Sequence, residues 1–384
     1  MTILEILMLF AFINCLIALA MTAANLRMYK LPPDDSLDTQ SNNPLVTVCV
    51  PARNEEANIE DCVRSLLASD LKSIEVIVYD DESTDQTGAI LNRITAEDSR
   101  LRLAQTQPLP DGWNGKQHGC YRCAEQANGE WLLFTDADVR FESGAVRRAV
   151  LHAKHTDSDL VSTFPRQITG TLPETLAVPM IFFMLFSYLP FKIMRDKQDN
   201  ANACAGCGQF LLARAEAYHK TGGHSAFKDT MHDGIKMPRR FRAVGFRTDL
   251  FDGTDLCRVR MYNGLGETWR GFTKNAFEGL GSVGLLVFLT VIHLSSHVLP
   301  WIVLPALIVL GLTDGLALPL ALGAVAASFT QRALLAERFK LKQLSVVLHP
   351  IGALTLVAIQ WHSLLIAKAG KRSWRGRPAV EGIP

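Results

Sequence analysis

The stretch Leu45-Val-Thr-Val-Cys-Val-Pro-Ala-Arg-Asn-Glu55 begins with β-branched residues and then changes abruptly to polar ones. Such a run predicts a short buried strand that ends where the polar residues begin. Apolar residues recur at helical spacing over 55–69, and two more apolar runs, 74–79 and 131–134, are each followed by acidic residues. Strands that alternate with helices in this way indicate an α/β fold with a mainly parallel, Rossmann-like sheet.

Polar residues follow three of the predicted strands directly. Asn54, Asp81 and Asp136 each lie just past a strand's carboxyl end. Parallel sheets bind their ligands at that edge, so we expect these side chains to lie close together. The sequence therefore predicts a polar ligand site at one edge of the sheet.

Asp136-x-Asp138 is the sharpest of these features. Two carboxylates at this spacing after a buried strand can share one hard divalent cation, which also takes diphosphate oxygens. The alternative is a D-x-D pair that occurs by chance in a loop. Asp80 and Asp81 suit a hydrogen bond to a base or a ribose, although Asp81 or Ser83 could instead cap the next helix.

A basic and an acidic residue complete the predicted site. Gly112-Trp-Asn-Gly-Lys116 reads as a loop before a helix, which suits a phosphate, with Lys116 as a compact positive charge. A solvated surface lysine is the alternative. Asp233 precedes a predicted helix and is a candidate general base for an acceptor hydroxyl, or else an N-cap.

Further residues of the sequence are assigned to the acceptor and to the metal. Gly208 and Gln209 stand at the start of a predicted strand over 209–212, where glycine lets an acceptor approach the backbone closely. His224 is considered as a further metal ligand beside Asp138. Two C-x-x-C pairs, Cys120/Cys123 and Cys204/Cys207, suit reduced thiols better than zinc, because about 80 residues separate them.

Four apolar segments predict membrane helices: 3–20, 281–311, 316–329 and 344–367. Basic residues follow the first segment and do not precede it, which favours a retained anchor over a signal peptide. Hydrophobic residues make up 48% of the chain, and the net charge of +1 argues against a dedicated nucleic-acid binder.

The positions of Lys and Arg predict that the regions after the first segment and before the last lie in the cytoplasm. The basic C-terminal tail favours the cytoplasm too, yet four simple crossings would place it outside. Either the last segment, which Pro350 and Gly352 interrupt, is re-entrant, or the number of crossings differs from four.

Two more apolar stretches are predicted at the membrane surface. Prolines interrupt 172–191, which favours an interfacial or re-entrant pair of helices over a crossing. Trp269 begins an apolar stripe at helical spacing that continues to Leu280, typical of an amphipathic interfacial helix or of one that packs against a core. We also assign Trp269 to the acceptor region of the site, with Gly208 and Gln209.

The chain resembles the family 2 glycosyltransferases, which invert the anomeric centre and have a GT-A fold. The resemblance covers about residues 44–280 and rests on Pro51-Ala-Arg-Asn-Glu55, Asp80-Asp-Glu-Ser-Thr-Asp85 and Thr135-Asp-Ala-Asp138, in that order. Within the family, Gly112-Trp-Asn-Gly-Lys116 and Trp269-Arg-Gly-Phe-Thr-Lys-Asn275 are most similar to the carotenoid-acid (diaponeurosporenoate) and hopanoid-associated glycosyltransferases.

The resemblance implies roles for single residues. Asp81 would hold the uracil of a UDP-sugar, Asp138 with Asp136 would bind Mg²⁺ or Mn²⁺ and the diphosphate, and Asp233 would be the base. The nucleotide-sugar site would comprise Pro51, Arg53, Asn54, Glu55, Asp80, Asp81, Lys116 and Asp136. His232 stands where the family carries a glutamate, which leaves the tuning of the base open. The chain lacks the Gln-x-x-Arg-Trp motif of processive polysaccharide synthases.

The sequence thus predicts a GT-A domain with transmembrane helices, in the cell (inner or plasma) membrane with the catalytic domain cytoplasmic. The expected reaction moves a single sugar from a UDP-hexose to a lipid or isoprenoid-type acceptor. A polysaccharide synthase, a sugar-phosphate nucleotidyltransferase and an impaired membrane scaffold are the alternatives. The predicted parts are an anchor (1–22), a linker (23–43), the GT-A domain (44–262), an interfacial helix (263–280), transmembrane helices (281–368) and a basic tail (369–384).

Overall fold

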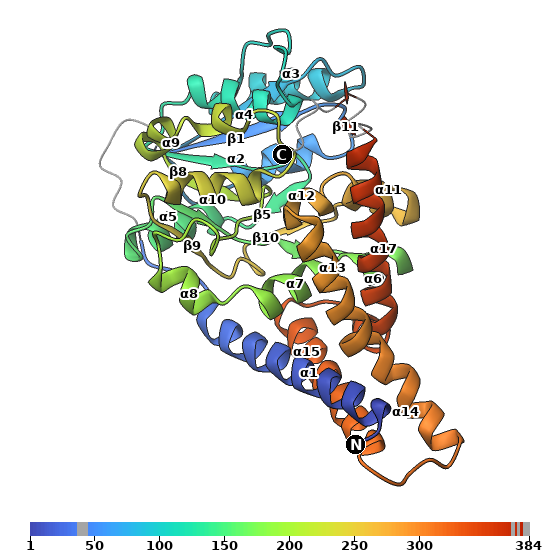
Figure 1. Cartoon of the computed structure of the whole chain (residues 1–384). Coiled ribbons are helices and arrows are strands. Elements are labelled where there is room, and N and C mark those ends of the chain that lie inside the picture. Colours follow the sequence, from blue (N-terminus) through green and yellow to red (C-terminus); the bar gives the residue numbers. More distant parts are fainter. Residues whose placement is uncertain (37–44, 370–372, 375–376, 379–384) are drawn as a thin grey trace. The chain divides into compact units, whose positions relative to one another are not determined.

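The computed structural model describes residues 1–36, 45–369, 373–374 and 377–378. The chain forms two compact units (Figure 1). The helical unit comprises residues 1–28, 167–192 and 261–369, and the α/β unit comprises 29–166, 193–260 and the residues from 370 onward.

A seven-stranded sheet is the centre of the α/β unit, with the strand order β3-β2-β1-β4-β8-β6-β9. Strands β1, β2, β3 and β4 are parallel to one another, whereas β8 runs antiparallel to both β4 and β6. The strand bounds are β1 Val46–Ala52, β2 Ile74–Asp80, β3 Leu101–Leu103, β4 Trp131–Phe134, β6 Leu160–Ser162, β8 Leu211–Arg214 and β9 Thr248–Leu250. The GT-A type of mainly parallel sheet is confirmed, and β8 begins two positions later than predicted.

Buried β-branched and aliphatic side chains explain why these segments are strands. All seven residues of β1 are buried, as are the first six of β2. Cys49, Ile77 and Leu132 belong to one core cluster with residues of helix α4 (Gly115–Glu125). Because side chains alternate along a strand, the residues next to each of these three in the sequence face the other side of the sheet. Helices cover both faces of the sheet (Figure 1).

The helices of the α/β unit follow the predicted alternation with shorter bounds. They are α2 Ile59–Leu67, α3 Thr87–Glu97, α4, α5 Ala145–His155, α8 Phe191–Asp196, α9 Ala215–Thr221, the 3₁₀ helix η1 Gly223–Phe227 and α10 Asp233–Ala243. A small antiparallel pair joins β5 (Val139–Phe141) to β10 (Cys257–Val259), and β7 (Arg166–Gln167) lies at the boundary of the units. Strands β11 (Ser373–Trp374) and β12 (Arg377–Pro378) pair near the C-terminus.

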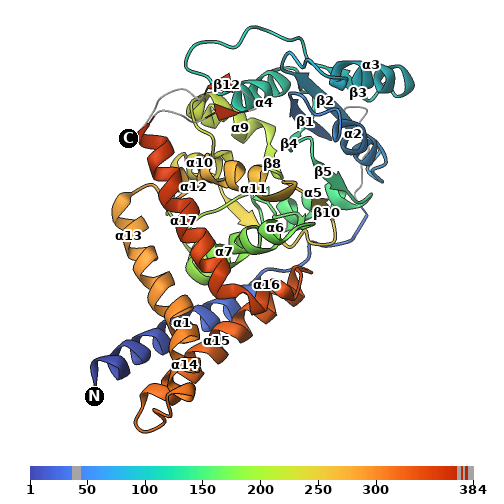
Figure 2. The ribbon, with the colours of Figure 1, turned by 90° about the vertical axis from the view of Figure 1, so that its right-hand side faces the viewer.

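Four helices among the described residues are long and apolar enough to cross a membrane: α1 Ile3–Met28, the continuous segment Val283–Val309, α15 Ala317–Arg338 and α17 His349–Lys368. The segment Val283–Val309 consists of α13 (Val283–Ile292), the π-helical turn η2 (His293–Val298) and α14 (Leu299–Val309). Figure 2 shows these helices from a second side. Helix α1 extends past the predicted anchor boundary at residue 22.

Shorter helices complete the helical unit: α6 Leu172–Ala177, α7 Met180–Tyr188, α11 Gly264–Thr273, α12 Ala276–Leu280 and α16 Leu344–Val347. The interrupted stretch 172–191 indeed forms separate helices, with Pro179 at the junction of α6 and α7. The single helix predicted over 263–280 is instead two helices, because the chain breaks at Lys274 and Asn275.

Candidate active site

The carboxyl ends of β2, β1 and β4 lie side by side. Ala52 at the end of β1 is opposite Asp80 of β2, and Cys49 is opposite Phe134 at the end of β4. The residues that continue from these strands therefore leave the sheet at one edge. Asp80 itself is the last residue of β2, and Pro51 lies within β1.

The ends of β1 and β2 are tied together through Arg53 and Asp81. The Arg53 guanidinium donates to the backbone carbonyl of Asp81 and lies 3.7 Å from the Asp81 carboxylate. The Asp81 amide donates to the Ala52 carbonyl at 2.8 Å, and the Asp81 side chain is buried. A buried carboxylate held beside a guanidinium is a fixed hydrogen-bond acceptor.

Asn54 and Glu55 join this edge to the loop after β2. Asn54 adopts a left-handed backbone (φ 52°), and its side-chain oxygen accepts from the Thr84 amide at 2.8 Å. Its amide donates to Ser83 Oγ at 2.9 Å, and the Glu55 amide donates to Thr87 Oγ1 at 2.8 Å. These bonds fix the six-residue loop 81–86 between β2 and α3.

The alternative in which Asp81 or Ser83 caps the next helix is wrong. Helix α3 begins at Thr87, and Asp85 Oδ1 accepts from the Thr87 amide at 3.0 Å. Ser83 and Asp80 bond within the loop instead, where Asp80 Oδ1 accepts from the Ser83 amide at 3.1 Å. The carboxylate of Asp81 is therefore not used as a helix cap.

Lys116 connects two carboxylates from separate parts of the chain. Its Nζ lies 2.7 Å from Asp136 Oδ1, just past β4, and 3.0 Å from Asp233 Oδ2, at the start of α10. Burial alone would lower the pKa of Lys116, but the two carboxylates outweigh burial and hold that pKa well above its ordinary value. Lys116 is thus a charged ammonium and not the solvated surface lysine of the alternative prediction.

Asn114 fixes where Lys116 stands. Its side-chain oxygen accepts from the Lys116 amide at 3.0 Å, so it caps the N-terminus of α4. Asn114 is not among the residues predicted for the site. An asparagine directly before a helical pattern was the available signal.

Asp233 is the first residue of α10, and its side chain is buried. Its Oδ1 accepts from the Gly234 amide at 2.8 Å. Burial alone would raise the pKa of Asp233, but the Lys116 ammonium and its other polar neighbours hold that pKa below its ordinary value. The helix-cap position itself belongs to His232, which makes no side-chain capping bond.

Gly208 leaves the space that the Asp233 carboxylate fills. A Cβ at position 208 would lie 2.1 Å from Asp233 Oδ1 and 2.8 Å from its Cγ. Next to it, Gln209 is buried, and its backbone carbonyl accepts from Thr135 Oγ1 at 2.8 Å, which ties this segment to the end of β4. The structure therefore brings Gly208 against the predicted base and ties Gln209 to Thr135, the residue before Asp136.

Gly208→Ala should displace Asp233 while leaving the sheet folded. We expect transfer to fall by about 10²-fold, because small misplacements of a reacting group cost about that much. Gly284→Ala is the matched control, since a Cβ there meets nothing within 4 Å. Transfer rates and melting temperatures of both variants are the measurement, and a Gly208→Ala variant with the rate of the control would contradict the packing argument.

The ring of His224 is enclosed, and among the described residues its Nε2 has no hydrogen-bond partner. Its ring is fully buried, its Nδ1 shares a hydrogen bond of 2.8 Å with Tyr218 Oη, and it packs on the ring of Phe134 with centroids 4.5 Å apart. Burial lowers the pKa of His224 to about 3, so the ring is neutral. Among the described residues, no group of three or more His, Cys, Asp or Glu side chains could hold a metal ion. Asp136, Asp138 and His224 thus form no ready-made cluster in the described residues, and their shared role as ligands stays a prediction. Both cysteine pairs carry free thiols.

Asp136 and Asp138 remain a suitable pair of donors without His224. Both follow β4, and both are only partly buried. Carboxylate oxygens are the ligands that Mg²⁺ and Mn²⁺ prefer, and Mg²⁺ sites commonly use one or two carboxylates plus substrate phosphates. The donor set therefore fits a divalent cation that a diphosphate would help to bind.

Trp269 belongs to the helical unit and not to the α/β unit that holds the other predicted residues. Its Nε1 donates to His362 Nδ1 of α17 at 2.8 Å. The stripe that begins at Trp269 thus packs, at least in part, against another helix of its own unit.

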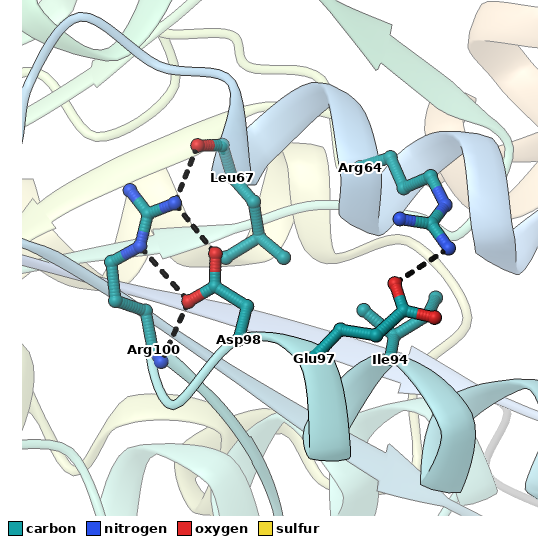
Figure 3. Close-up of a pocket in the computed structure, with 6 residues that line it drawn as sticks. All are labelled: Arg64, Leu67, Ile94, Glu97, Asp98 and Arg100. Carbon is teal, nitrogen blue, oxygen red and sulfur yellow. Dashed lines mark hydrogen bonds and ion pairs between the residues drawn. The ribbon is translucent and has the colours of Figure 1, made fainter.

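A surface pocket of about 270 Å³ lies between the C-terminal ends of α2 and α3 (Figure 3). Its lining residues are Arg64, Leu67, Ile94, Glu97, Asp98 and Arg100. The arginines already pair with Glu97 and Asp98, at 2.9 and 2.7 Å. Because α2 leads into the start of β2, this pocket is at the opposite edge of the sheet and takes no part in the candidate site.

Residues 47–222 match the family described as Glycosyl transferase family 2. A mannosyltransferase from Pyrobaculum calidifontis, solved with GDP-Man and Mn²⁺, has the same fold, with a TM-score of 0.56 and 20% identity over 94% of this chain and 99% of that one. Together with the sheet, these matches show a fold of the GT-A type, and the part of the chain over residues 47–222 is similar to the family 2 glycosyltransferases.

At a finer level the chain is similar to two 4,4'-diaponeurosporenoate glycosyltransferases from Staphylococcus aureus. Strain MRSA252 has a relative with 26% identity and strain USA300 one with 27%, each over 244 residues. The matched part spans 62% of this chain and 63% of the length of these relatives.

Proposed function

We propose that the protein is an inverting glycosyltransferase that moves one sugar from a nucleotide-sugar, a UDP-hexose, to a lipid or isoprenoid-type acceptor at the cell membrane. The observation that carries this proposal is the bridge from Lys116 to Asp136 at 2.7 Å and to Asp233 at 3.0 Å. Lys116 thereby joins Asp136, the carboxylate proposed to act at the diphosphate, to Asp233, the carboxylate proposed to act on the acceptor. A donor bound at the edge of the sheet would then have its anomeric carbon near Asp233.

The chain's own residues account for each proposed step. Asp81, oriented by Arg53, accepts a hydrogen bond from the base of the nucleotide, with Pro51, Asn54, Glu55 and Asp80 beside it. Asp136 and Asp138 would hold Mg²⁺ or Mn²⁺, which offsets the charge of the leaving diphosphate. Asp233 takes the proton of the acceptor O–H, the oxygen bonds to the anomeric carbon from the face opposite the diphosphate, and the nucleoside diphosphate leaves with the bonding pair. Lys116 adds positive charge where negative charge develops.

The similarity to the diaponeurosporenoate glycosyltransferases supports an apolar, lipid-like acceptor, as do the four helices that could cross a membrane. The segment Pro51–Glu55 and the residues Gly208 and Gln209 are the proposed nucleoside and acceptor borders of the site. We place the α/β unit on the cytoplasmic side, where nucleotide-sugars are made.

The test uses the purified chain in detergent with radiolabelled UDP-glucose and other UDP-hexoses, and with GDP-mannose because the mannosyltransferase of the same fold was solved with it. Lipid extracts of cells with and without the gene supply acceptors, and mass spectrometry should find a hexose-sized difference between them. The proposal is refuted if the chain catalyses neither transfer nor hydrolysis with any of these donors.

Replacing Lys116 with methionine should shift the pH dependence of the reaction. The Lys116 ammonium lowers the pKa of Asp233, so its loss raises that pKa, and the base becomes protonated at a higher pH. The acidic limb of kcat/KM should therefore move to higher pH, with a lower rate at every pH. Lys72→Met is the control, because Lys72 donates to the Ser69 carbonyl and takes no part in the candidate site. An unshifted acidic limb would show that the ammonium does not act on the base.

A further inference from the structure

Helix α17 is long and apolar enough for a fourth crossing, but its contacts inside the helical unit point elsewhere. Side-chain contacts define the directions in which the other three long segments run. Glu5 Oε1 accepts from the Leu316 amide at 2.9 Å, where α1 and α15 begin, and Gln331 Nε2 donates to Thr22 Oγ1 at 2.9 Å, near their ends. Helices α1 and α15 therefore run parallel, and both finish where Met28 leads into the α/β unit, which we call the domain end.

The segment Val283–Val309 runs the other way. The Ser296 carbonyl in η2 accepts from Cys15 Sγ at 3.1 Å, and His297 Nδ1 lies 3.3 Å from Ser328 Oγ. From that level α14 continues to the turn at 310–316, which begins α15. We call this turn the loop end, so the segment Val283–Val309 starts at the domain end and finishes at the loop end.

Helix α17 begins near the point where α15 finishes. A Cβ on Gly352 would lie 3.1 Å from the Leu176 carbonyl at the end of α6, and Arg332 of α15 donates to the Pro179 carbonyl, 3.3 Å away, at the start of α7. His349 Nε2 also lies 3.1 Å from His297 Nδ1, part of the way along the segment Val283–Val309. The start of α17 is therefore inside the unit and nearer to the domain end than the turn at 310–316 is.

The last turns of α17 are also at the domain end. Trp361 Nε1 donates to Thr290 Oγ1 of α13 at 3.0 Å, and Ser363 Oγ accepts from the Phe277 amide of α12 at 2.9 Å. Thr290 lies in the first third of the segment Val283–Val309, and Phe277 precedes that segment. Within the described residues, α17 packs on α6, α11, α12 and η2 and makes no comparable packing with α1 or α15. Figure 2 shows α17 running from α16 away from the N-terminus.

We infer that the chain crosses the bilayer three times, through α1, Val283–Val309 and α15, and that α16 and α17 form a re-entrant element. This element enters the lipid from the domain end and leaves again on the same side. Re-entrant backbone is stable at membrane depth only where protein surrounds it. His349 and Gly352 meet this condition, because both are buried against neighbouring helices.

The charges of the sequence support the same arrangement independently. Four crossings would separate the basic residues of the C-terminal tail from those that follow α1 and α15. Three crossings put all of them on the domain side, as the bias of Lys and Arg toward one side of a membrane requires. The tail residues concerned are Lys368, Lys371, Arg372, Arg375 and Arg377.

Single cysteines introduced into the full chain test this topology. Ser36→Cys marks the domain side, Thr313→Cys marks the loop end, and Ser373→Cys reports the tail. A membrane-impermeant maleimide is applied to intact spheroplasts and to inverted membrane vesicles, and the unaltered chain measures the background from its eight native cysteines, seven of them buried. Ser373→Cys should be labelled in the same preparation as Ser36→Cys and protected where Thr313→Cys is labelled.

Labelling of Ser373→Cys together with Thr313→Cys would overturn the inference and restore four crossings. Should the thiol at 373 react poorly even in detergent, protease digestion of a C-terminal epitope tag in the same two preparations gives the same comparison. The labelling needs no donor or acceptor, so its outcome is independent of the proposed glycosyl transfer.

Discussion

Asp233→Asn should reduce sugar transfer by about 10³-fold, within the range that a positioned general base contributes. The amide has the shape of the carboxylate, so it still fits beside Gly208 and still accepts from the Gly234 amide. It cannot take the proton of the acceptor hydroxyl. The measurements are the turnover rate, the KM for the donor and the melting temperature of the detergent-solubilised chain.

The donor KM should change little in Asp233→Asn, because the nucleotide is bound by groups at the ends of β1, β2 and β4. Lys116 keeps its partner Asp136, so the ammonium is not left unpaired. The matched control is Asp229→Asn, which makes the same chemical change on an exposed carboxylate four positions earlier. A variant that retains a tenth of the activity or more would exclude Asp233 as the base.

The strand ends of the site could be predicted from the sequence because their positions follow from topology. Once three apolar runs are assigned to parallel strands, Asn54, Asp81 and Asp136 must leave the sheet at one edge. No distance information is needed for that step. The same reasoning predicts a mainly parallel α/β sheet, and the resemblance to the family 2 glycosyltransferases implies that this sheet is of the GT-A type.

The contacts between distant segments could not be predicted in this way. Lys116 and Asp233 are separated by more than a hundred positions, and they come within 3.0 Å because α4 and α10 both pack on η1. The surroundings of His224 could not be predicted for a related reason. Its sequence neighbourhood does not reveal that Tyr218 and Phe134 enclose the ring.

The membrane part shows the limit of composition as a guide. Length and hydropathy assign α17 to the same class as α1 and α15, because they measure only whether a helix suits lipid. A helix crosses the membrane only if it starts at one end of the helical bundle and finishes at the other. In α17 that information is carried by Gly352, Trp361 and Ser363, through contacts with segments far away in the sequence.

Asp138→Ala should abolish both transfer and the dependence of donor binding on a divalent cation, without unfolding the chain. A cation at a leaving diphosphate stabilises the transition state by several kcal/mol, so we expect a loss of about 10³-fold. Chelation of the unaltered protein with EDTA should cause a similar loss, and added Mn²⁺ or Mg²⁺ should restore it. Asp61→Ala is the control, since that side chain is 74% exposed.

Calorimetric titrations separate the cation from the chemistry. Mn²⁺ with UDP should bind the unaltered chain and Asp61→Ala but not Asp138→Ala, while the melting temperatures of all three stay close. Asp136→Ala should weaken binding of the same pair and also release Lys116, so its loss should combine both effects. Full activity of Asp138→Ala, or an unaltered enzyme that EDTA does not inhibit, would show that the metal role of this carboxylate pair is wrong. The Asp233 measurements would still decide whether the site is a transferase.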